Sequence, residues 1–348
     1  MNVAQLQNMI FDEDHRRMFL GVHGWSIDKP VGRDSSIRRY FRVSKNDRTA
    51  ILMETVPDHS PHVTPGHSLG DFIRIARWMK DIGLKVPEIY EQDLDSGYLL
   101  LEDLGDVCFR DALDAGESAQ TLYTVAKDTL AYIAAQDCPL NLPAYYDSHV
   151  HRRHRRVVDW FVPLARRRRN ETGLIETYKN VWQGIEAALP PCPQTFLHID
   201  FHAQNLMWLP EEQGIKRCGI LDFQGAMIGP HLYDLANLLE DARRDIPSDV
   251  KETLLAPLSE TEKAWFRILA TQFHCRVIGQ FIKQAALDEN PSYLKHIPRL
   301  QNYLHSAMKD PLLQPLKQFF DDLGVDFSVP ADLDSIPALH ALVAPDAQ

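Results

Sequence analysis

The sequence LHIDFHAQNLMW at residues 197–208, followed by ILDFQ at 220–224, places three polar side chains at a chemically useful spacing. Asp200 and Asp222 each follow a short apolar stretch that is typical of a β-strand, and Asn205 stands five positions after Asp200. An Asp that begins a loop can accept a proton from an attacking hydroxyl, and an Asn and a second Asp can supply oxygen ligands to Mg²⁺ on nucleotide phosphates. The pattern therefore predicts phosphoryl transfer, with Asp200 catalytic and with Asn205 and Asp222 as metal ligands. A β-hairpin with incidental acids is the alternative.

The two segments resemble the catalytic and metal-binding loops of the aminoglycoside phosphotransferase family, whose members are relatives of protein kinases. His-Ile-Asp at 198–200 stands where kinases have His-Arg-Asp, and Asp-Phe-Gln at 222–224 stands where they have Asp-Phe-Gly. The resemblance implies an α+β, protein-kinase-like fold with two lobes, in which a small antiparallel sheet precedes a larger, mostly helical part. It also implies ATP and Mg²⁺ as cofactors.

Composition limits the classes of protein to which the chain can belong. With 348 residues the chain is long enough for two separate cores, and its net charge of −11 argues against a general binder of nucleic acid or of anionic membranes. No apolar run approaches the roughly 20 residues of a membrane span, and acids interrupt the N-terminal stretch where a signal peptide needs an apolar core. The five widely spaced Cys favour reduced, structural thiols. We therefore expect a cytoplasmic protein.

The first hundred residues alternate between helix and strand patterns. Apolar residues at helical spacing predict helices over 2–20 and 69–83. Short β-prone segments bounded by turn residues predict five strands, at 25–31, 39–43, 49–54, 87–93 and 97–102.

The segment between the first two predicted strands, GRDSSIRR at 32–39, lies where a kinase has its phosphate-covering loop. Small residues such as Ser35 and Ser36 allow backbone N–H groups to approach phosphate oxygens, and Arg38 and Arg39 can pair with them. We therefore predict that these four residues bind nucleotide phosphates. An ordinary polar hairpin turn is the alternative.

The third predicted strand departs from the family pattern. Kinases and most aminoglycoside phosphotransferases carry a lysine there that pairs with the nucleotide's α/β-phosphates, whereas this chain reads Ala-Ile-Leu-Met at 50–53. Either another cation contacts the phosphates, with Arg38 or Arg39 nearest in sequence, or Mg²⁺ and backbone donors are sufficient. An ATP-binding pseudokinase that lacks this lysine is a further alternative.

The sequence LEDLG at 101–105 resembles the hinge between the lobes of the kinase-like fold, whose backbone groups contact the edge of adenine. We therefore assign Glu102, Asp103 and Leu104 to nucleotide binding. The predicted domains are a nucleotide-binding lobe at 1–103, a helical catalytic and acceptor lobe at 104–327, and a loosely ordered tail at 328–348.

Helical patterns dominate the remainder, with helices predicted over 117–136, 148–169 and 172–189 and several more between 259 and 323. The helix over 148–169 is basic in an acidic chain. Three interpretations are open for its arginines: the solvated face of a helix, a cationic wall that attracts an anionic substrate and, least favoured because few aromatic residues are interleaved, a nucleic-acid surface.

Four segments more closely resemble the bacterial anomeric kinases of cell-wall amino sugars, a subgroup that also lacks the strand lysine; they lie at 36–43, 99–106, 200–207 and 221–226. This resemblance implies ATP-dependent phosphorylation of the anomeric hydroxyl of N-acetylmuramate or N-acetylglucosamine, which would supply a sugar 1-phosphate for peptidoglycan recycling. Another small hydroxyl acceptor of the aminoglycoside or choline type is the alternative. A protein kinase is disfavoured, because the short segment between Phe223 and Tyr233 cannot hold an activation loop and a peptide platform.

Overall fold

The structure is a computed structural model that describes residues 7, 11–32, 38–63, 68–288 and 290–344. It divides into two compact units: unit 1 contains Met1–Leu142 and His198–Ala226, and unit 2 contains Pro143–Leu197 and Met227–Gln348. The domain limits expected at residues 103 and 327 fall inside these units and remain predictions.

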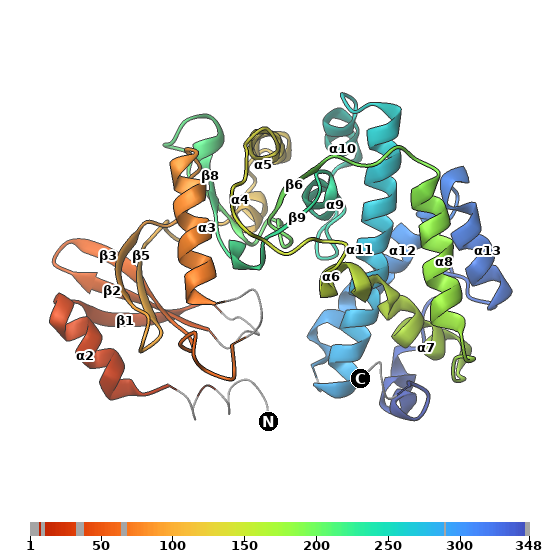
Figure 1. Ribbon diagram of the computed structural model, residues 1–348, viewed down its shortest axis with the longest axis horizontal. Helices are drawn as coiled ribbons and strands as arrows, with labels where there is room; N and C mark the ends of the chain where they lie inside the picture. The colour runs from red at the N-terminus through yellow and green to blue at the C-terminus, as the bar shows by residue number, and fades with distance from the viewer. Residues whose placement is uncertain (1–6, 8–10, 33–37, 64–67, 289, 345–348) are drawn as a thin grey trace. The chain divides into compact units, whose positions relative to one another are not determined.

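Unit 1 contains a five-stranded sheet in the order β1-β2-β3-β5-β4, and each strand is antiparallel to its neighbours (Figure 1). A second, two-stranded sheet pairs β7 with β8. The elements of unit 1 are α2 (Glu13–His23), β1 (Ser26–Val31), β2 (Arg39–Lys45), β3 (Arg48–Glu54), α3 (Leu69–Asp81), β4 (Ile89–Asp93), β5 (Tyr98–Glu102), α4 (Phe109–Asp114), α5 (Ala119–Ala134), β7 (Leu206–Trp208), η3 (Gly214–Arg217), β8 (Cys218–Ile220) and η4 (Phe223–Gly225).

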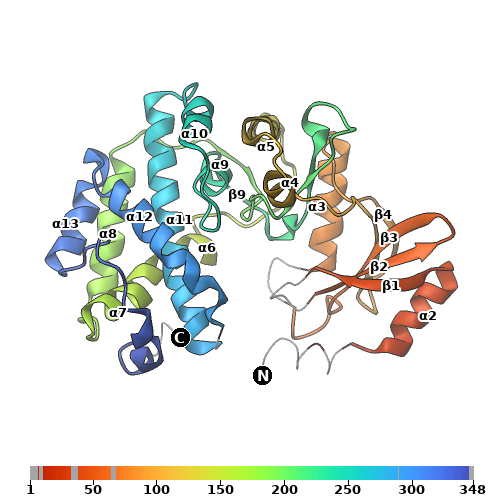
Figure 2. The same ribbon diagram turned by 180° about the vertical axis from the view of Figure 1, so that it is seen from behind.

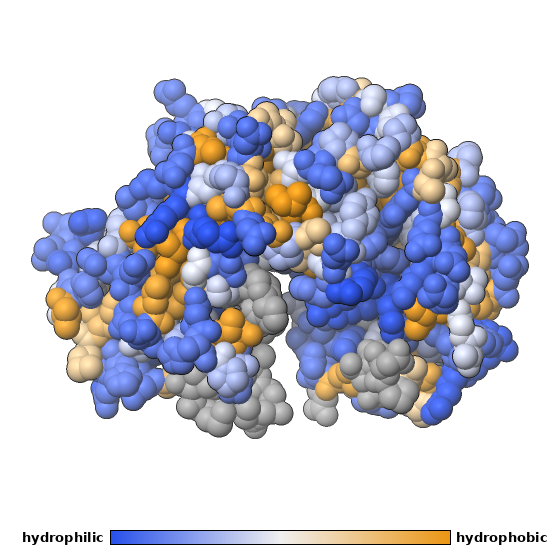
Figure 3. Space-filling model, in the orientation of Figure 1, coloured by the Kyte–Doolittle hydropathy of each residue, from blue (hydrophilic) through white to orange (hydrophobic). Residues whose placement is uncertain are grey.

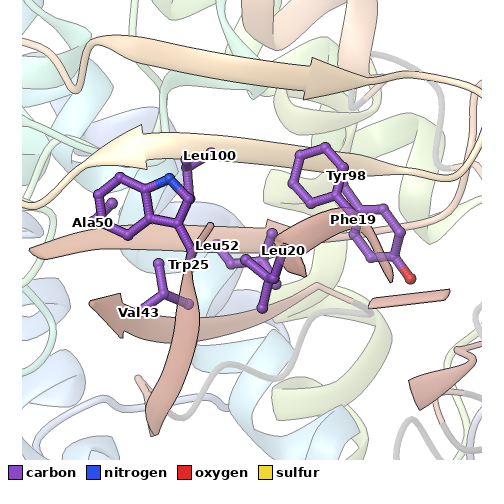
Figure 4. Packing of buried hydrophobic residues seen from close by; sticks show 8 residues of the cluster. All are labelled: Phe19, Leu20, Trp25, Val43, Ala50, Leu52, Tyr98 and Leu100. Carbon is purple, nitrogen blue, oxygen red and sulfur yellow. The ribbon is translucent and has the colours of Figure 1, made fainter. Parts of the chain in front are cut away.

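The five predicted strands are therefore confirmed, and their alternating side chains build an apolar core. Figure 4 shows this cluster of eight buried residues, which α2 shares with strands β2, β3 and β5. Leu52 belongs to it and is fully buried. Successive side chains of a strand point to opposite faces, so Met53 lies on the other face of β3, where it is fully buried as well. An apolar thioether thus occupies the position expected for the family's lysine.

Unit 2 is built around α11, a 28-residue helix that begins with a capping box between Ser259 and Glu262. Helix α12 packs along it (Figure 2). A two-stranded antiparallel sheet pairs β6 with β9. The elements of unit 2 are α6 (His149–Arg152), η1 (Arg153–Arg155), η2 (Val157–Phe161), α7 (Val162–Arg166), α8 (Leu174–Ala187), β6 (Gln194–Leu197), β9 (Met227–Pro230), α9 (Tyr233–Leu239), α10 (Ser248–Leu255), α11 (Glu260–Leu287), η5 (Pro291–His296), α12 (Ile297–Ala307), η6 (Pro311–Leu313), α13 (Gln314–Asp322) and η7 (Leu333–Ala341). The α+β class, with a small antiparallel sheet and a largely helical remainder, is confirmed.

Two segments differ from the helices that we expected. The segment over 148–169 is not one helix: it consists of the α-turn α6, the 3-10 turn η1, the π-helix η2 and the short α7. Pro163 in the first turn of α7 lacks an N–H group, and Arg167 ends α7 with a left-handed φ of 53°. At the N-terminus α2 begins at Glu13, and most of the first half of the expected helix lies outside the described residues.

The segment that we expected to be a loosely ordered tail contains the 3-10 helix η7, whose Ile336 and Leu339 are buried. Within the described part of the chain, no helix combines the length and the apolar composition that crossing a membrane requires.

Candidate active site

Two loops of unit 1 carry the predicted catalytic and metal-binding residues. Loop 198–205 precedes β7, and loop 221–225 follows β8. Each contains a residue with a positive φ that is not glycine: Ile199 at 78° and Asp222 at 61°. Such backbone conformations are costly for residues with a Cβ and concentrate at functional sites, where the surrounding structure maintains them. Ile199 directly precedes Asp200, and Asp222 is itself one of the residues that the sequence pattern selected.

Hydrogen bonds join the two loops. Nε2 of the buried His198 donates to the carbonyl oxygen of Leu221 at 2.7 Å, and the backbone N–H of Leu221 donates to the carbonyl oxygen of Asn205 at 2.9 Å. Nδ2 of Asn205 donates to the carbonyl oxygen of Asp200 at 3.0 Å. The structure therefore brings Asp200, Asn205 and the residue that precedes Asp222 into one hydrogen-bonded assembly.

The histidines of this region hold the loop. Besides the bond made by His198, Nδ1 of His202 accepts a hydrogen bond from the backbone N–H of Gln204 at 3.3 Å, and the carbonyl oxygen of His202 accepts one from the N–H of Asn205 at 2.9 Å. Both histidines therefore stabilise the loop through hydrogen bonds. The exposed carboxylate of Asp200 remains the base that the sequence predicts.

Asp222 presents a partly exposed carboxylate with polar neighbours. Its Oδ1 accepts a hydrogen bond from Nε2 of Gln224 at 2.6 Å, and Nη1 of Arg38 lies 3.8 Å from the same oxygen. The side chain of Arg38 is only 6% exposed, compared with 34% for that of Asp222. A nearly buried cation therefore stands beside the predicted metal ligand.

An aromatic contact connects loop 221–225 to α3. The ring of Phe223 is fully buried, and its centroid lies 4.8 Å from that of Phe72, in the first turns of α3. Apolar packing against α3 therefore positions this loop.

The four residues predicted to bind phosphates differ in where they lie and in what they contact. Ser35 and Ser36 lie outside the described residues. Arg38 contacts Asp222, as described above. Arg39 pairs instead with the fully buried Glu54, with Nε at 2.7 Å and Nη2 at 2.6 Å from Oε2. The structure therefore favours Arg38 over Arg39 as the cation of the site.

The predicted hinge is held by ion pairs that the sequence pattern did not reveal. The Arg42 guanidinium pairs with Asp103: its Nε lies 2.7 Å from Oδ2, and its Nη2 donates to Oδ1 at 3.0 Å. This contact raises the pKa of the Arg42 guanidinium and helps to lower the pKa of the Asp103 carboxyl despite its partial burial. Glu102 pairs with Nζ of Lys85 at 2.7 Å, and its backbone N–H donates to the carbonyl oxygen of Glu88 at 2.7 Å. The only signal for these ion pairs in the sequence was the presence of oppositely charged residues far apart in the chain.

Strand β8 passes close to the hinge. A Cβ added at Gly219 would lie 3.0 Å from Cδ1 of Leu104. Strand β8, which leads to Asp222, therefore packs tightly against the side chain of Leu104, the last of the three predicted hinge residues. A residue larger than glycine at 219 would displace either the strand or that side chain.

The donor atoms fit a magnesium ion whose coordination is completed by the phosphates of a nucleotide. Asn205 offers an amide oxygen, and Asp222 offers a partly exposed carboxylate, both of them hard oxygen ligands. The described residues contain no group of three or more His, Cys, Asp or Glu side chains arranged to hold a metal. Mg²⁺ commonly binds through one or two protein oxygens together with substrate phosphates and water, which matches this small donor set.

Comparison with known proteins agrees with this geometry. A model of the phosphotransferase enzyme family matches residues 28–272. The N-acetylmuramate/N-acetylglucosamine kinase of Caulobacter vibrioides is 30% identical over 89% of this chain and 96% of its own length. The protein of the same name from Pseudomonas aeruginosa is 30% identical over 80% of this chain and 83% of its own length.

Solved structures show the same kinase-like fold. The choline kinase LicA from Streptococcus pneumoniae superposes with a TM-score of 0.57 at 14% identity, over 86% of this chain and 99% of that one. The GDP complex of aminoglycoside 2'-phosphotransferase-IIIa gives a TM-score of 0.59 at 12% identity, over 85% and 99% of the two chains. The family match covers more than half of the chain and includes both loops, so the chain belongs to the phosphotransferase enzyme family.

Proposed function

We propose that this protein is an ATP-dependent sugar kinase that phosphorylates the anomeric hydroxyl of N-acetylmuramate and N-acetylglucosamine. The observation that carries the proposal is the hydrogen-bonded assembly of loops 198–205 and 221–225, which retains a base candidate and two metal-ligand candidates. The names of relatives at 30% identity support the choice of sugar. Retention of this set disfavours a pseudokinase.

Asp200 would accept, or orient, the proton of the sugar hydroxyl as its oxygen attacks the γ-phosphorus of ATP. The phosphoryl group passes through a loose transition state, which needs positioning and charge neutralisation more than a strong base. Asn205 and Asp222 would hold Mg²⁺, which neutralises the phosphate charge when bound. The bond from Asn205 to the Asp200 carbonyl keeps base and metal ligand at a constant separation.

Arg38 would replace the lysine that β3 lacks. Its guanidinium is nearly buried and lies 3.8 Å from the Asp222 carboxylate, so it can reach phosphates on a metal held by that carboxylate. A guanidinium contacts phosphate through two parallel N–H groups, so it can substitute for an ammonium group at such a site.

The edge of adenine would bind at the hinge through the backbone of Asp103 and Leu104. The N–H of Glu102 already donates to Glu88 and is not available to a nucleotide. Nucleotides bound to structural relatives, ADP in aminoglycoside phosphotransferase APH(2'')-Ib and GDP in the 2'-phosphotransferase-IIIa, support the assignment of a nucleotide site.

Phosphorus NMR would test the proposal directly. The protein is incubated with Mg²⁺-ATP and, separately, with N-acetylmuramate, N-acetylglucosamine, an aminoglycoside and choline. We expect a sugar 1-phosphate signal with the amino sugars. In Asp200→Asn turnover should fall by roughly 10²- to 10⁴-fold, the usual contribution of a positioned base, while ATP binding measured by calorimetry is retained. In Asp222→Asn we expect ATP binding in the presence of Mg²⁺ to be lost.

Near-normal turnover in Asp200→Asn would exclude this residue as the base. Phosphorylation of choline or of the aminoglycoside alone would retain the phosphotransferase and reject the sugar. ATP binding without turnover of any acceptor would favour the pseudokinase alternative.

A further inference from the structure

Arg42, in the middle of β2, lies on the face of the five-stranded sheet that is turned away from the apolar core beneath α2. The next residue, Val43, is fully buried in that core (Figure 4), and successive side chains of a strand point to opposite faces. Arg42 stands directly opposite Ile51 of β3, two residues before Met53. Arg42 and Met53 therefore share one face of the sheet.

The guanidinium of Arg42 reaches from this face to a short segment that follows β5. Its Nε and Nη2 contact the two carboxylate oxygens of Asp103, as described above. Nη1 donates to Oδ1 of Asp106 at 2.6 Å, and Nη2 also donates to the carbonyl oxygen of Gly105 at 3.3 Å. One side chain thus contacts three of the four residues 103–106, which we call the hinge turn.

The contacts of Arg42 determine the backbone conformation of the hinge turn. Oδ1 of Asp103, the oxygen that accepts from Nη2, also accepts from the N–H of Gly105 at 3.0 Å. Gly105 has a φ of 90°, in the left-handed region that favours glycine. Because Arg42 orients the Asp103 carboxylate, it also orients the tight turn that this carboxylate closes.

Both partners of the main ion pair stay charged near neutral pH. The hydrogen bond to Asp103 raises the pKa of the Arg42 guanidinium. Burial acts to raise the pKa of the Asp103 carboxyl, but hydrogen bonds from Arg42, Gly105 and Thr49 lower it below its usual range. The side chains of Arg42 and Asp103 are only 11% and 7% exposed. A bidentate pair in such an environment fixes orientation as well as distance.

Hydrogen bonds within unit 1 restrict which backbone groups of the hinge a base can reach. The N–H of Glu102 donates to the carbonyl oxygen of Glu88, and the N–H of Gly105 donates to Asp103. Between these two occupied groups lies the backbone of Asp103 and Leu104, which we assign to the edge of adenine. The register in which a base can bind is therefore set by the conformation of the hinge turn.

Adenine and guanine differ in the groups that such a backbone would contact. Adenine carries an amino donor at the position where guanine carries a carbonyl acceptor. A backbone held in one register complements one of the two edges, and the other base leaves donors and acceptors unpaired. Structural relatives have been solved with ADP and with GDP, so the fold alone does not choose the base.

We propose that Arg42 is a positioning residue that holds the hinge turn in the register for adenine and thereby selects ATP over GTP. This role rests on the proposed function, which places the base at the hinge. The guanidinium is engaged by the hinge turn and acts through the backbone of Asp103 and Leu104. Loss of Arg42 should therefore change the affinity for the base and leave the chemical step unchanged.

Calorimetry with Mg²⁺-ATP and Mg²⁺-GTP, without any acceptor, tests the proposal. We expect the wild-type protein to bind ATP about ten-fold or more tightly than GTP, the effect of one unpaired buried polar group. Arg42→Met should weaken ATP binding by about ten-fold and GTP binding much less, so that the preference is largely lost. Arg42→Lys keeps the charge without the bidentate contact and should show an intermediate preference.

Arg48→Met is the matched control, because Arg48 begins β3 in the same β2–β3 hairpin. Its exposed guanidinium lies 5.5 Å from the centroid of the Tyr90 ring, and Figure 3 shows a hydrophilic surface at the end of this hairpin. Both nucleotide affinities should be unchanged in this variant. Melting temperatures verify that each variant is folded, and Arg42→Lys decides the matter where Arg42→Met is not.

An ATP preference that persists in the folded Arg42 variants would overturn the proposal, as would equal losses for ATP and GTP, which a merely structural role predicts. Equal affinity of the wild-type protein for both nucleotides would overturn it too. In sugar phosphorylation Arg42→Met should raise KM for ATP and leave kcat nearly unchanged.

The proposed function fails separately from the role of Arg42. If no amino sugar is phosphorylated while the ATP preference depends on Arg42, the sugar is rejected and the positioning residue is retained. If amino sugars are phosphorylated equally well with ATP and GTP, the sugar kinase is retained and the role of Arg42 is rejected.

Discussion

Arg38 and Arg39 are neighbours in the sequence and carry the same charge, but the structure gives them different partners. Arg38 faces the Asp222 carboxylate of the candidate active site, and Arg39 faces the buried carboxylate of Glu54. Glu54 also pairs with Arg16, at 3.1 Å. We therefore infer a role in nucleotide binding for Arg38 and a role in stability for Arg39, which a pair of substitutions can separate.

We predict that Arg38→Met weakens binding of Mg²⁺-ATP by about ten- to hundred-fold, because a charge-assisted contact to phosphate is lost. Arg38→Lys, which keeps the charge, should retain part of the affinity for Mg²⁺-ATP. Arg39→Met should instead lower the free energy of unfolding by about 1–3 kcal/mol, because a buried carboxylate loses a partner. Calorimetric titration and chemical denaturation measure the two effects. The assignment is wrong if Arg39→Met, correctly folded, loses as much ATP affinity as Arg38→Met.

At the scale of elements, the close approach of α11 to η1 depends on Gly279. The added Cβ of Gly279→Ala would meet backbone atoms of Arg156, which cannot move without disturbing η1 and η2. Gly184 in α8 is a matched control, since a Cβ there meets no atom within 4 Å.

We predict that Gly279→Ala lowers the free energy of unfolding by about 1–3 kcal/mol, because overpacking outweighs the better helix propensity of alanine. Gly184→Ala should raise it by up to about 1 kcal/mol, because propensity acts alone there. Urea denaturation of both variants provides the comparison. A stabilised Gly279→Ala would contradict the packing described for α11.

The elements show where sequence patterns succeed and where they fail. The strands of the N-terminal sheet were predictable, because alternating apolar residues and turn residues act locally. The basic segment over 148–169 was predicted as one helix and is broken into four elements, because the packing of Arg156 against Gly279, 123 positions away, overrides local helical spacing.

For the molecule as a whole, the small donor set of Asn205 and Asp222 predicts that the metal and the nucleotide stabilise the protein together. A ligand that binds only the folded state raises stability by RT ln(1 + [L]/Kd), or about 2.7 kcal/mol at 100 times Kd. We expect Mg²⁺ alone to leave the melting temperature unchanged and Mg²⁺-ATP to raise it by several degrees. EDTA should remove most of that increase. A large shift with Mg²⁺ alone would indicate a metal site made entirely of protein ligands.

The sequence by itself determined the class of fold and selected the candidate residues of the site. Asp200, Asn205 and Asp222 were selected because their spacing and their position after apolar strands are local properties, and the family motifs extend over the same short segments.

Only the tertiary structure decided which acid each arginine faces. Arg38 and Arg39 are neighbours in the sequence, yet the fold supplies Asp222 to the first and Glu54 to the second. In the basic segment it supplies Asp159 to Arg155, and Glu171 and Asp332 to Arg166, Arg167 and Arg168. Electrostatic energy depends on distance and burial rather than on sequence separation. The partner of each charge therefore becomes known only when the chain is folded.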